Sequence, residues 1–187
     1  TTTREVLHDI VGFDLHRGVV AAADRRPLPQ LADLTATPGR LRIAALEGLN
    51  DPENVGAVAR SARAFGLDAL VLDPTCTDPY ARRTVRVSMG EVLHLPVVRS
   101  ADWAATIDEL AVADVETWAL TPARDADDIW TLGLPERLAL VVGAEGSGLR
   151  SSTMRRCHRR VRIPIRSGVD SLNVAAASAV AFAVTGR

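Results

Sequence analysis

Three stretches of the chain combine glycines with polar side chains in patterns that suit a binding or catalytic loop. The first, residues 47–60, reads EGLNDPENVGAVAR and contains Asn54 and Arg60. A guanidinium is permanently charged and presents a planar fork of donors, so Arg60 is suited to holding a phosphate or a developing oxyanion. The alternative is an ordinary arginine on the solvent side of a helix, which the spacing alone favours.

Helix signals in this first stretch define which side of it can face a ligand. Asp51 is the predicted N-cap and Pro52 takes the first helical position. Gly56 and Arg60 lie one turn apart on the other side from the apolar arc. A bare glycine beside a guanidinium leaves room for a ligand to approach the backbone and the charge together. The apolar arc that should face the core consists of Val55, Val58, Ala59, Ala62 and Phe65.

The second stretch, residues 141–149, reads VVGAEGSGL and places three glycines between a predicted strand and a predicted helix. Open α/β sheets bind ligands at this position, beyond the carboxyl ends of their strands. The order G-x-x-G-x-G differs from the dinucleotide fingerprint, the chain has no lysine for a Walker motif, and Glu145 would repel a phosphate. The pattern therefore favours a nucleoside or an uncharged group, with a tight turn that needs glycine as the alternative.

The third stretch, residues 163–174, reads IPIRSGVDSLNV and joins the end of a strand to a helix. We expect that helix to begin at about Ser171, with the Ser171 hydroxyl as its N-cap. Asn173 would then lie in the first turn, where its amide either caps the helix or meets a substrate. The small residues that follow, 174–181, permit close packing against a neighbouring element.

Apolar runs alternate with helical patterns from residue 41 onward. Nearly continuous apolar strands that alternate with helices predict an α/β fold: a mostly parallel sheet with helices on both faces. Residues 11–23 are read as a strand or a helix and residues 31–38 as a linker. The expected strands are 41–49, 69–72, 95–98, 115–120, 138–142 and 161–165, and the expected helices are 52–65, near 80–87, 103–112, 149–157 and 172–184.

The composition sets the class of protein. With 187 residues, 47% hydrophobic and 24% charged, the chain fits one globular domain with a short appendage. No apolar run reaches the roughly 18 residues that span a bilayer, and no signal peptide opens the chain. Because no run is long enough, we expect no membrane partner. Cys76 and Cys157 lack the spacing of metal ligands and indicate a reducing compartment, so we expect no metal.

Charge is distributed unevenly along a chain whose net charge is −1. Residues 150–166 hold seven arginines and no acid, whereas residues 100–130 hold eight acids and one arginine. We therefore expect one basic face on a protein that is neutral overall.

Taken together, N-x-G-A-x-x-R, G-x-E-G-x-G and I-P…S-L-N-V, in this order, resemble the SpoU (TrmH-like) family of RNA ribose 2'-O-methyltransferases over about residues 41–185. The resemblance implies a SPOUT-class catalytic domain over 41–187 with a C-terminal deep trefoil knot. It also implies S-adenosylmethionine as methyl donor, a homodimer and a cytoplasmic location. Residues 11–19 look like the end of an L30e-like RNA-binding domain, so 1–40 is expected to be the remnant of that substrate-binding domain plus a linker.

The resemblance also assigns roles to single residues. Arg60 matches the family's essential arginine, and because a guanidinium stays protonated we expect it to hold a phosphate and stabilise the developing alkoxide. The other catalytic positions, which would orient the nucleotide or this arginine, are Asn54, Glu145, Ser171 and Asn173. The cofactor contacts map to Leu120, Thr121, Gly143, Gly146, Ile163, Ile165 and Leu172. The expected contacts with RNA phosphates are Arg155, Arg156, Arg159 and Arg160.

Three functions compete at this point. The leading hypothesis is methyl transfer from S-adenosylmethionine to a ribose 2'-hydroxyl of structured RNA, with ribosomal RNA favoured over transfer RNA. A catalytically inactive RNA-binding module of the same fold is the alternative, although Arg60, Glu145 and Asn173 are all present. A nucleotide-dependent oxidoreductase is disfavoured by the glycine order and by the missing acid for a ribose.

Overall fold

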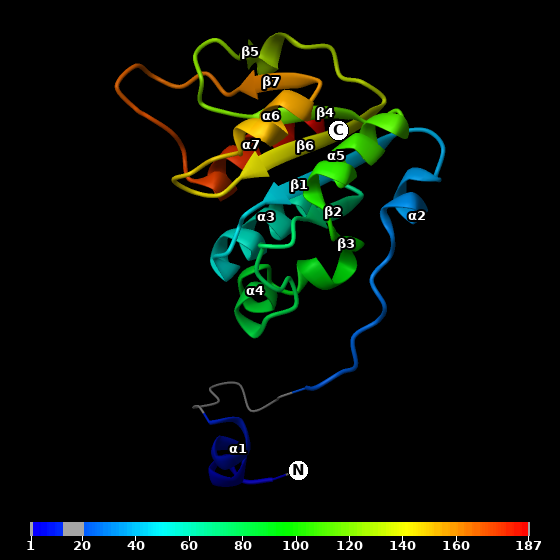
Figure 1. Ribbon diagram of the computed structural model, residues 1–187. Helices are drawn as coiled ribbons and strands as arrows, with labels where there is room; N and C mark the ends of the chain where they lie inside the picture. The colour runs from blue at the N-terminus through cyan, green and yellow to red at the C-terminus, as the bar shows by residue number, and fades with distance from the viewer. Residues whose placement is uncertain (1, 13–20, 187) are drawn as a thin grey trace.

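The computed structural model describes residues 2–12 and 21–186, and within them it forms a seven-stranded parallel sheet (Figure 1). The strand order is β3-β2-β1-β6-β4-β7-β5, with the two longest strands, β1 and β6, paired near the centre. The predicted α/β fold is confirmed. The strands are β1 Leu41–Glu47, β2 Ala69–Leu72, β3 Val97–Arg99, β4 Glu116–Leu120, β5 Asp127–Asp128, β6 Arg137–Gly143 and β7 Arg159–Arg162.

Helices cover both faces of this sheet, because alternate side chains of each strand point to opposite sides. Ala44 and Leu46 of β1 pack in one core cluster with α3 and α7, whereas Ile43 and Ala45 pack in another with α2 and α5. The helices are α1 Arg4–Val11, α2 Leu31–Thr35, α3 Pro52–Ala64, α4 Arg82–Val87, α5 Trp103–Val112, α6 Ser151–Arg156 and α7 Val174–Thr185, with 3-10 turns η1 Glu91–His94 and η2 Ile129–Thr131.

Two predicted boundaries near the C-terminus are wrong. The strand expected over 161–165 is β7 Arg159–Arg162, so Ile163 and Ile165 leave the sheet and enter a loop. Pro164 lacks the N–H that a further ladder bond would need, which explains the early end. The helix expected from about Ser171 begins two to three residues later, at Val174.

The N-terminal part differs from the expectation of a linker over 31–38. Leu31–Thr35 forms the short helix α2, and the buried Leu31 side chain packs in the α5 cluster. The Arg137 guanidinium donates to the carbonyls of Thr35 and Thr37, both at 2.7 Å, and ties this segment to the start of β6. Residues 13–20, where most of the L30e-like resemblance falls, lie outside the described residues, so the remnant-domain interpretation stays a prediction.

Gly56 serves packing between helices and does not flank an open space. A Cβ atom at this position would lie 2.7 Å from the Thr84 carbonyl oxygen and 2.9 Å from the Val87 Cβ. The missing side chain therefore lets α3 contact the backbone of α4 directly. The expectation that Gly56 leaves room for a ligand is wrong, because the periodicity of one helix does not reveal which neighbour covers its other side.

We expect Gly56→Val to lower the free energy of unfolding by about 2 kcal/mol, as overpacking typically does. Gly133→Val is the control, because a Cβ there meets nothing within 4 Å and its cost should stay within about 0.5 kcal/mol. Urea denaturation of both variants measures the difference. Equal stabilities would contradict the close helix contact.

Candidate active site

Three loops meet at the carboxyl edge of the sheet and enclose a cavity of about 200 Å³. They follow β6, β4 and β7, which are neighbours in the sheet, so their carboxyl ends lie side by side (Figure 1). Parallel strands with this order place ligand sites at that edge. The lining residues are Leu120, Thr121, Pro122, Val142, Gly143, Ala144, Glu145, Gly146, Gly148, Ile163, Ile165, Ser171, Leu172, Val174 and Ala177.

The walls of this cavity are mostly apolar. All seven positions that the resemblance assigns to the cofactor lie in its lining, although they come from three loops far apart in the sequence. Ile163 and Ile165 line it because they left the sheet after β7. Glu145 is the one ionisable residue among the lining residues. The cavity therefore suits a ligand with an apolar body and either a neutral or a positively charged group.

The glycines of residues 143–148 are required by the loop itself. Ala144 and Gly148 form an isolated antiparallel bridge, and the Gly148 N–H donates to the Ala144 carbonyl at 2.9 Å. Gly146 and Gly148 adopt φ values of +87° and +65°, which glycine tolerates best. A Cβ at Gly143 would lie 2.3 Å from the Leu149 nitrogen. The segment is thus a tight turn that needs its glycines, and it also lines the cavity.

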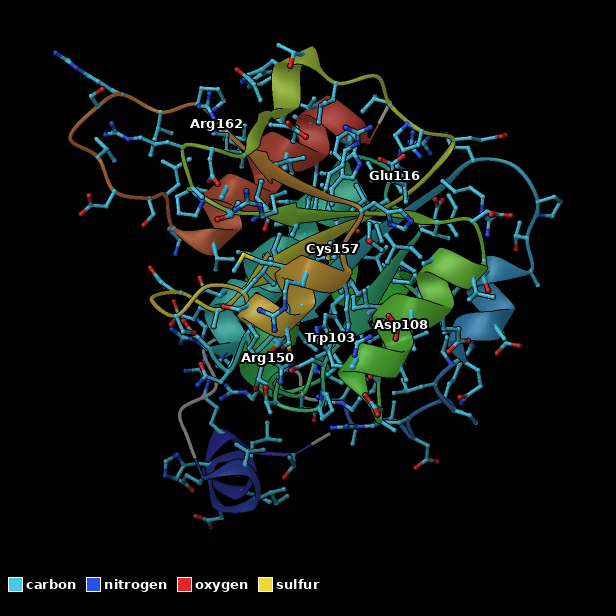
Figure 2. The ribbon with its side chains drawn as sticks, turned by 45° about the horizontal axis from the view of Figure 1, so that its top comes forward. Trp103, Asp108, Glu116, Arg150, Cys157 and Arg162 are labelled. Carbon is cyan, nitrogen blue, oxygen red and sulfur yellow. The ribbon has the colours of Figure 1, made fainter. Side chains whose placement is uncertain are left out.

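A buried carboxylate holds the far end of this loop. Register pairs Glu47 at the end of β1 with Gly143 at the end of β6, so the Glu47 side chain lies beside the loop. Glu47 is 3% exposed and accepts from the Arg150 N–H at 2.6 Å, from Trp103 Nε1 at 2.6 Å, and from the Thr153 hydroxyl. Figure 2 labels Arg150 and Trp103 at the starts of α6 and α5, the two helices that this carboxylate joins.

Arg150 links Glu47 to a second buried acid. Its Nε lies 3.0 Å from Glu47 Oε1 and its Nη2 lies 2.9 Å from Asp73 Oδ2. Burial by itself raises the pKa of Asp73, but hydrogen bonds from the Thr75 hydroxyl and from backbone N–H groups, including that of Gly48, outweigh it and hold the pKa below its ordinary value. Sequence reasoning missed Glu47, Asp73 and Arg150, although an acid at the end of a buried strand is a recognisable signal.

Asn173, Asn54 and Glu145 form a hydrogen-bonded cluster at the rim of the cavity. Asn173 is the N-cap of α7, and its Oδ1 accepts from the N–H groups of Ala175 and Ala176. Its Nδ2 must then face outward, where it donates to Asn54 Oδ1 at 3.2 Å and reaches Glu145 Oε1 at 3.5 Å. Asn54 Nδ2 donates to Glu145 Oε2 at 3.2 Å. The cap thus fixes the orientation of both amides and of the carboxylate.

Ser171 and Arg60 lie outside this cluster. Ser171 lines the cavity but does not cap α7, so the predicted cap is wrong by two residues. Arg60 is exposed and, within residues 2–12 and 21–186, its side chain makes no hydrogen bond or ion pair. Asn54 and Arg60 are six positions apart on α3, which separates them by about 120° around the helix. The fold therefore brings Asn54, Glu145, Ser171 and Asn173 to one rim, whereas Arg60 lies on a different side of α3 from Asn54.

The expected basic face is largely neutralised. Arg156 pairs with Asp108 at 2.6 Å, Arg159 with Glu116 at 2.9 Å, and Arg160 with Asp125 at 2.7 Å. The acid-rich segment lies against the arginine-rich one, with Asp108 and Glu116 beside α6 and β7 (Figure 2). The segregation of charge along the sequence is thus not a segregation in space.

Arg155 is exposed, and no hydrogen bond or ion pair holds it within the described part of the chain. The assignment of these arginines to RNA phosphates, which covers Arg155, Arg156, Arg159 and Arg160, stays a prediction. For the last three residues, RNA binding would require an existing ion pair to open.

The described residues contain no group of three or more His, Cys, Asp or Glu side chains placed to hold a metal ion. Burial raises the pKa of Cys76 to about 12 and that of Cys157 to about 11, so both thiols stay protonated at neutral pH. Among the same residues, no helix is both long and apolar enough to cross a membrane.

A comparison with protein families shows to which family this chain belongs. A model of the SpoU rRNA Methylase family matches residues 42–183. The chain belongs to the SpoU rRNA methylase family. The match covers β1 through most of α7 and includes every residue of the cavity and of the rim cluster.

Individual SpoU relatives agree with this membership. An uncharacterized tRNA/rRNA methyltransferase of Mycobacterium tuberculosis is 44% identical over 181 residues, covering 95% of this chain and 62% of the relative. The 23S rRNA (guanosine-2'-O-)-methyltransferase of Ralstonia nicotianae is 34% identical over 179 residues, covering 94% of this chain and 71% of that protein. The AdoMet-bound rRNA methyltransferase of Sinorhizobium meliloti has a TM-score of 0.73 and 26% identity, covering 85% and 60% of the two chains. This chain therefore spans about three fifths of the Mycobacterium and Sinorhizobium proteins.

We expect Asn173→Ala to lower the free energy of unfolding by about 1 kcal/mol, because α7 loses its cap. Asn173→Ser keeps a capping oxygen, and Ser171→Ala removes a hydroxyl that caps nothing, so both should stay within about 0.5 kcal/mol of the unaltered protein. Urea denaturation of the three variants gives the comparison. A larger loss of unfolding free energy for Ser171→Ala than for Asn173→Ala would show that Ser171 is the N-cap of α7.

Proposed function

We propose that this chain carries the catalytic domain of an enzyme that transfers a methyl group from S-adenosylmethionine to a ribose 2'-hydroxyl of structured RNA, with ribosomal RNA favoured. The observation that carries the proposal is the convergence of seven cofactor positions from three separate loops on one cavity. The named activity of the Ralstonia relative, on a guanosine 2'-oxygen of 23S rRNA, supports the choice of the ribose hydroxyl and of ribosomal RNA.

The residues present fit S-adenosylmethionine. Its adenosine and its aliphatic chain suit walls such as Leu120, Val142 and Ile163, and its positive sulfonium suits a lining whose one ionisable group is the Glu145 carboxylate. A Cβ at Gly146 would meet nothing within 4 Å, so this glycine leaves backbone open toward a ligand. The Sinorhizobium structure with bound AdoMet supports the same assignment. When bound, the cofactor supplies an electrophilic methyl group.

The residues at the rim would position the nucleotide. Asn173 and Asn54 hold the Glu145 carboxylate in one orientation, so Glu145 is preorganised to accept a hydrogen bond from a ribose hydroxyl. Ser171, exposed on the neighbouring loop, offers a further hydroxyl toward the same space. Because the ribose hydroxyl is a weak nucleophile, its alignment by such groups supplies much of the rate.

Arg60 would stabilise negative charge on the RNA and would not act as a general base. Its guanidinium stays protonated at neutral pH, so it can hold the phosphate beside the target ribose and stabilise the alkoxide that develops. Its freedom from ion pairs within the described residues leaves the full charge for that purpose.

We also propose that the protein is a homodimer. Helix α7 is composed of small and apolar residues around its whole circumference, and Ala175, Ala179 and Val180 remain partly exposed. An apolar surface of this kind favours burial against a second copy. The C-terminal trefoil knot that the resemblance implies stays a prediction as well.

The protein should bind S-adenosylmethionine and its demethylated product without added metal, and Gly146→Val should weaken binding at least about ten-fold. A valine at φ +87° is strained, and position 146 is part of the cavity lining. Gly90→Val is the matched control, since Gly90 has φ +85° but lies away from the cavity. Isothermal titration calorimetry measures both. Absence of binding by the folded, unaltered protein would overturn the cofactor assignment.

Arg60→Ala should slow methyl transfer by about 100-fold or more while leaving stability within about 0.5 kcal/mol, because Arg60 is exposed and packs against no core residue. Arg63→Ala, an exposed arginine one turn further along α3, should leave the rate nearly unchanged. The measurement is single-turnover methylation of ribosomal RNA from a strain lacking the gene, followed by nuclease digestion and mass spectrometry of 2'-O-methylnucleosides.

Equal rates of methyl transfer for Arg60→Ala and the unaltered protein would show that Arg60 is not a catalytic residue. Methylated bases in place of methylated riboses would refute the proposed acceptor. A protein that binds the RNA but transfers no methyl group would support the inactive RNA-binding module.

A further inference from the structure

A second cavity, of about 320 Å³, adjoins the first and is lined by three arginines. These are Arg124 from the loop after β4, Arg162 at the end of β7, and Arg166 from the loop after β7. Asp170 is the one acid in its lining, so the lining carries an excess of two positive charges. Figure 2 labels Arg162 on the β7 side of the sheet, close to the long loop that leads toward α7.

The charge of these arginines is not compensated. Arg124 and Arg166 are exposed, and in the described part of the chain the side chain of neither has a hydrogen bond or an ion pair. Arg162 uses its Nε to donate to the Ala126 carbonyl at 3.1 Å, which leaves its terminal Nη1 and Nη2 groups for a ligand. Arg156, Arg159 and Arg160, by contrast, are all engaged with carboxylates, as described above.

The two cavities share a wall. Pro122, Ile163 and Ile165 line both of them, so a ligand in the second cavity lies next to a ligand in the first. In RNA, a ribose and its flanking phosphates are separated by only a few bonds. A ribose presented to the first cavity therefore brings a backbone phosphate within reach of the second.

We propose that Arg124, Arg162 and Arg166 form a phosphate site that binds the RNA backbone beside the methylated nucleotide. Guanidinium groups match phosphate oxygens in geometry and stay charged at every physiological pH. This inference rests on the proposed function, and it places a backbone phosphate beside the cofactor cavity, at the end of β7. The carboxylate of S-adenosylmethionine is the other anion that could reach this cavity, and the experiment separates the two.

The test compares three double variants by fluorescence anisotropy with a labelled RNA hairpin, over about 50 to 300 mM KCl. We expect Arg124→Ala/Arg166→Ala to bind at least about ten-fold more weakly at low salt and to lower the slope of log K against log salt by about 1.5, as two lost phosphate contacts require. Arg124→Lys/Arg166→Lys should restore most of the slope. Arg63→Ala/Arg83→Ala, a control that removes two exposed arginines paired with Glu91 and Glu53 on another part of the molecule, should stay within about two-fold.

Calorimetry with S-adenosylmethionine is the second readout, and it also shows that each variant is folded. Unchanged cofactor affinity in Arg124→Ala/Arg166→Ala, together with weakened RNA binding, supports the phosphate site. Weakened cofactor affinity with unchanged RNA binding assigns the cavity to the cofactor carboxylate and overturns the inference. Equal RNA binding and equal slopes for this variant and the unaltered protein overturn it too, while leaving the proposed function intact. Failure of the unaltered protein to bind the hairpin would contradict both the phosphate site and the proposed RNA substrate.

Discussion

Two buried carboxylates, Glu47 and Asp73, share the guanidinium of Arg150, and the arrangement of the sheet's carboxyl edge depends on this contact. Charges that leave water need partners, and Arg150 together with the surrounding N–H and O–H donors provides them. Because Arg150 directly follows the glycine loop, the same contact anchors that loop to the ends of β1 and β2. Trp103 and Thr153 extend the anchor to α5 and α6.

A second constraint acts at the rim of the cavity. The N-cap of α7 uses one side of the Asn173 amide, which leaves the other side to orient Asn54 and, through it, Glu145. The two constraints hold the glycine loop from both ends, one at Arg150 and one at Glu145. A cavity whose walls are fixed before a ligand arrives loses little entropy on binding, which is how a site built from loops achieves specificity.

Much of this architecture is predictable from local patterns. Strands such as β2 and β6 and helices such as α3 and α5 follow from apolar periodicity, and the positions around the cavity follow from the three motifs. The failures concern contacts between distant segments. Periodicity placed Gly56 away from the core but could not show that α4 covers it, and a count of arginines could not show that Asp108, Glu116 and Asp125 lie opposite them.

The predicted boundaries of β7 and α7 were wrong for a related reason. Both Ser171 and Asn173 are good caps, and the choice between them depends on Asn54 and Glu145, which are remote in sequence. Likewise, the branched apolar side chains of Ile163 and Ile165 suit a strand, yet the sheet offers β7 partners only as far as Arg162. Sequence motifs located the site, but its hydrogen bonds and charges are set by tertiary neighbours.

The central claim is that one cavity, enclosed by the loops after β4, β6 and β7, holds the methyl donor. A crystal structure of the protein grown with the demethylated cofactor tests it most directly. The account predicts the ligand between Thr121, Gly146 and Leu172, with Glu145 at the mouth of the cavity and the Arg150 contacts unchanged. A ligand bound elsewhere on the molecule, with this cavity empty, would contradict it.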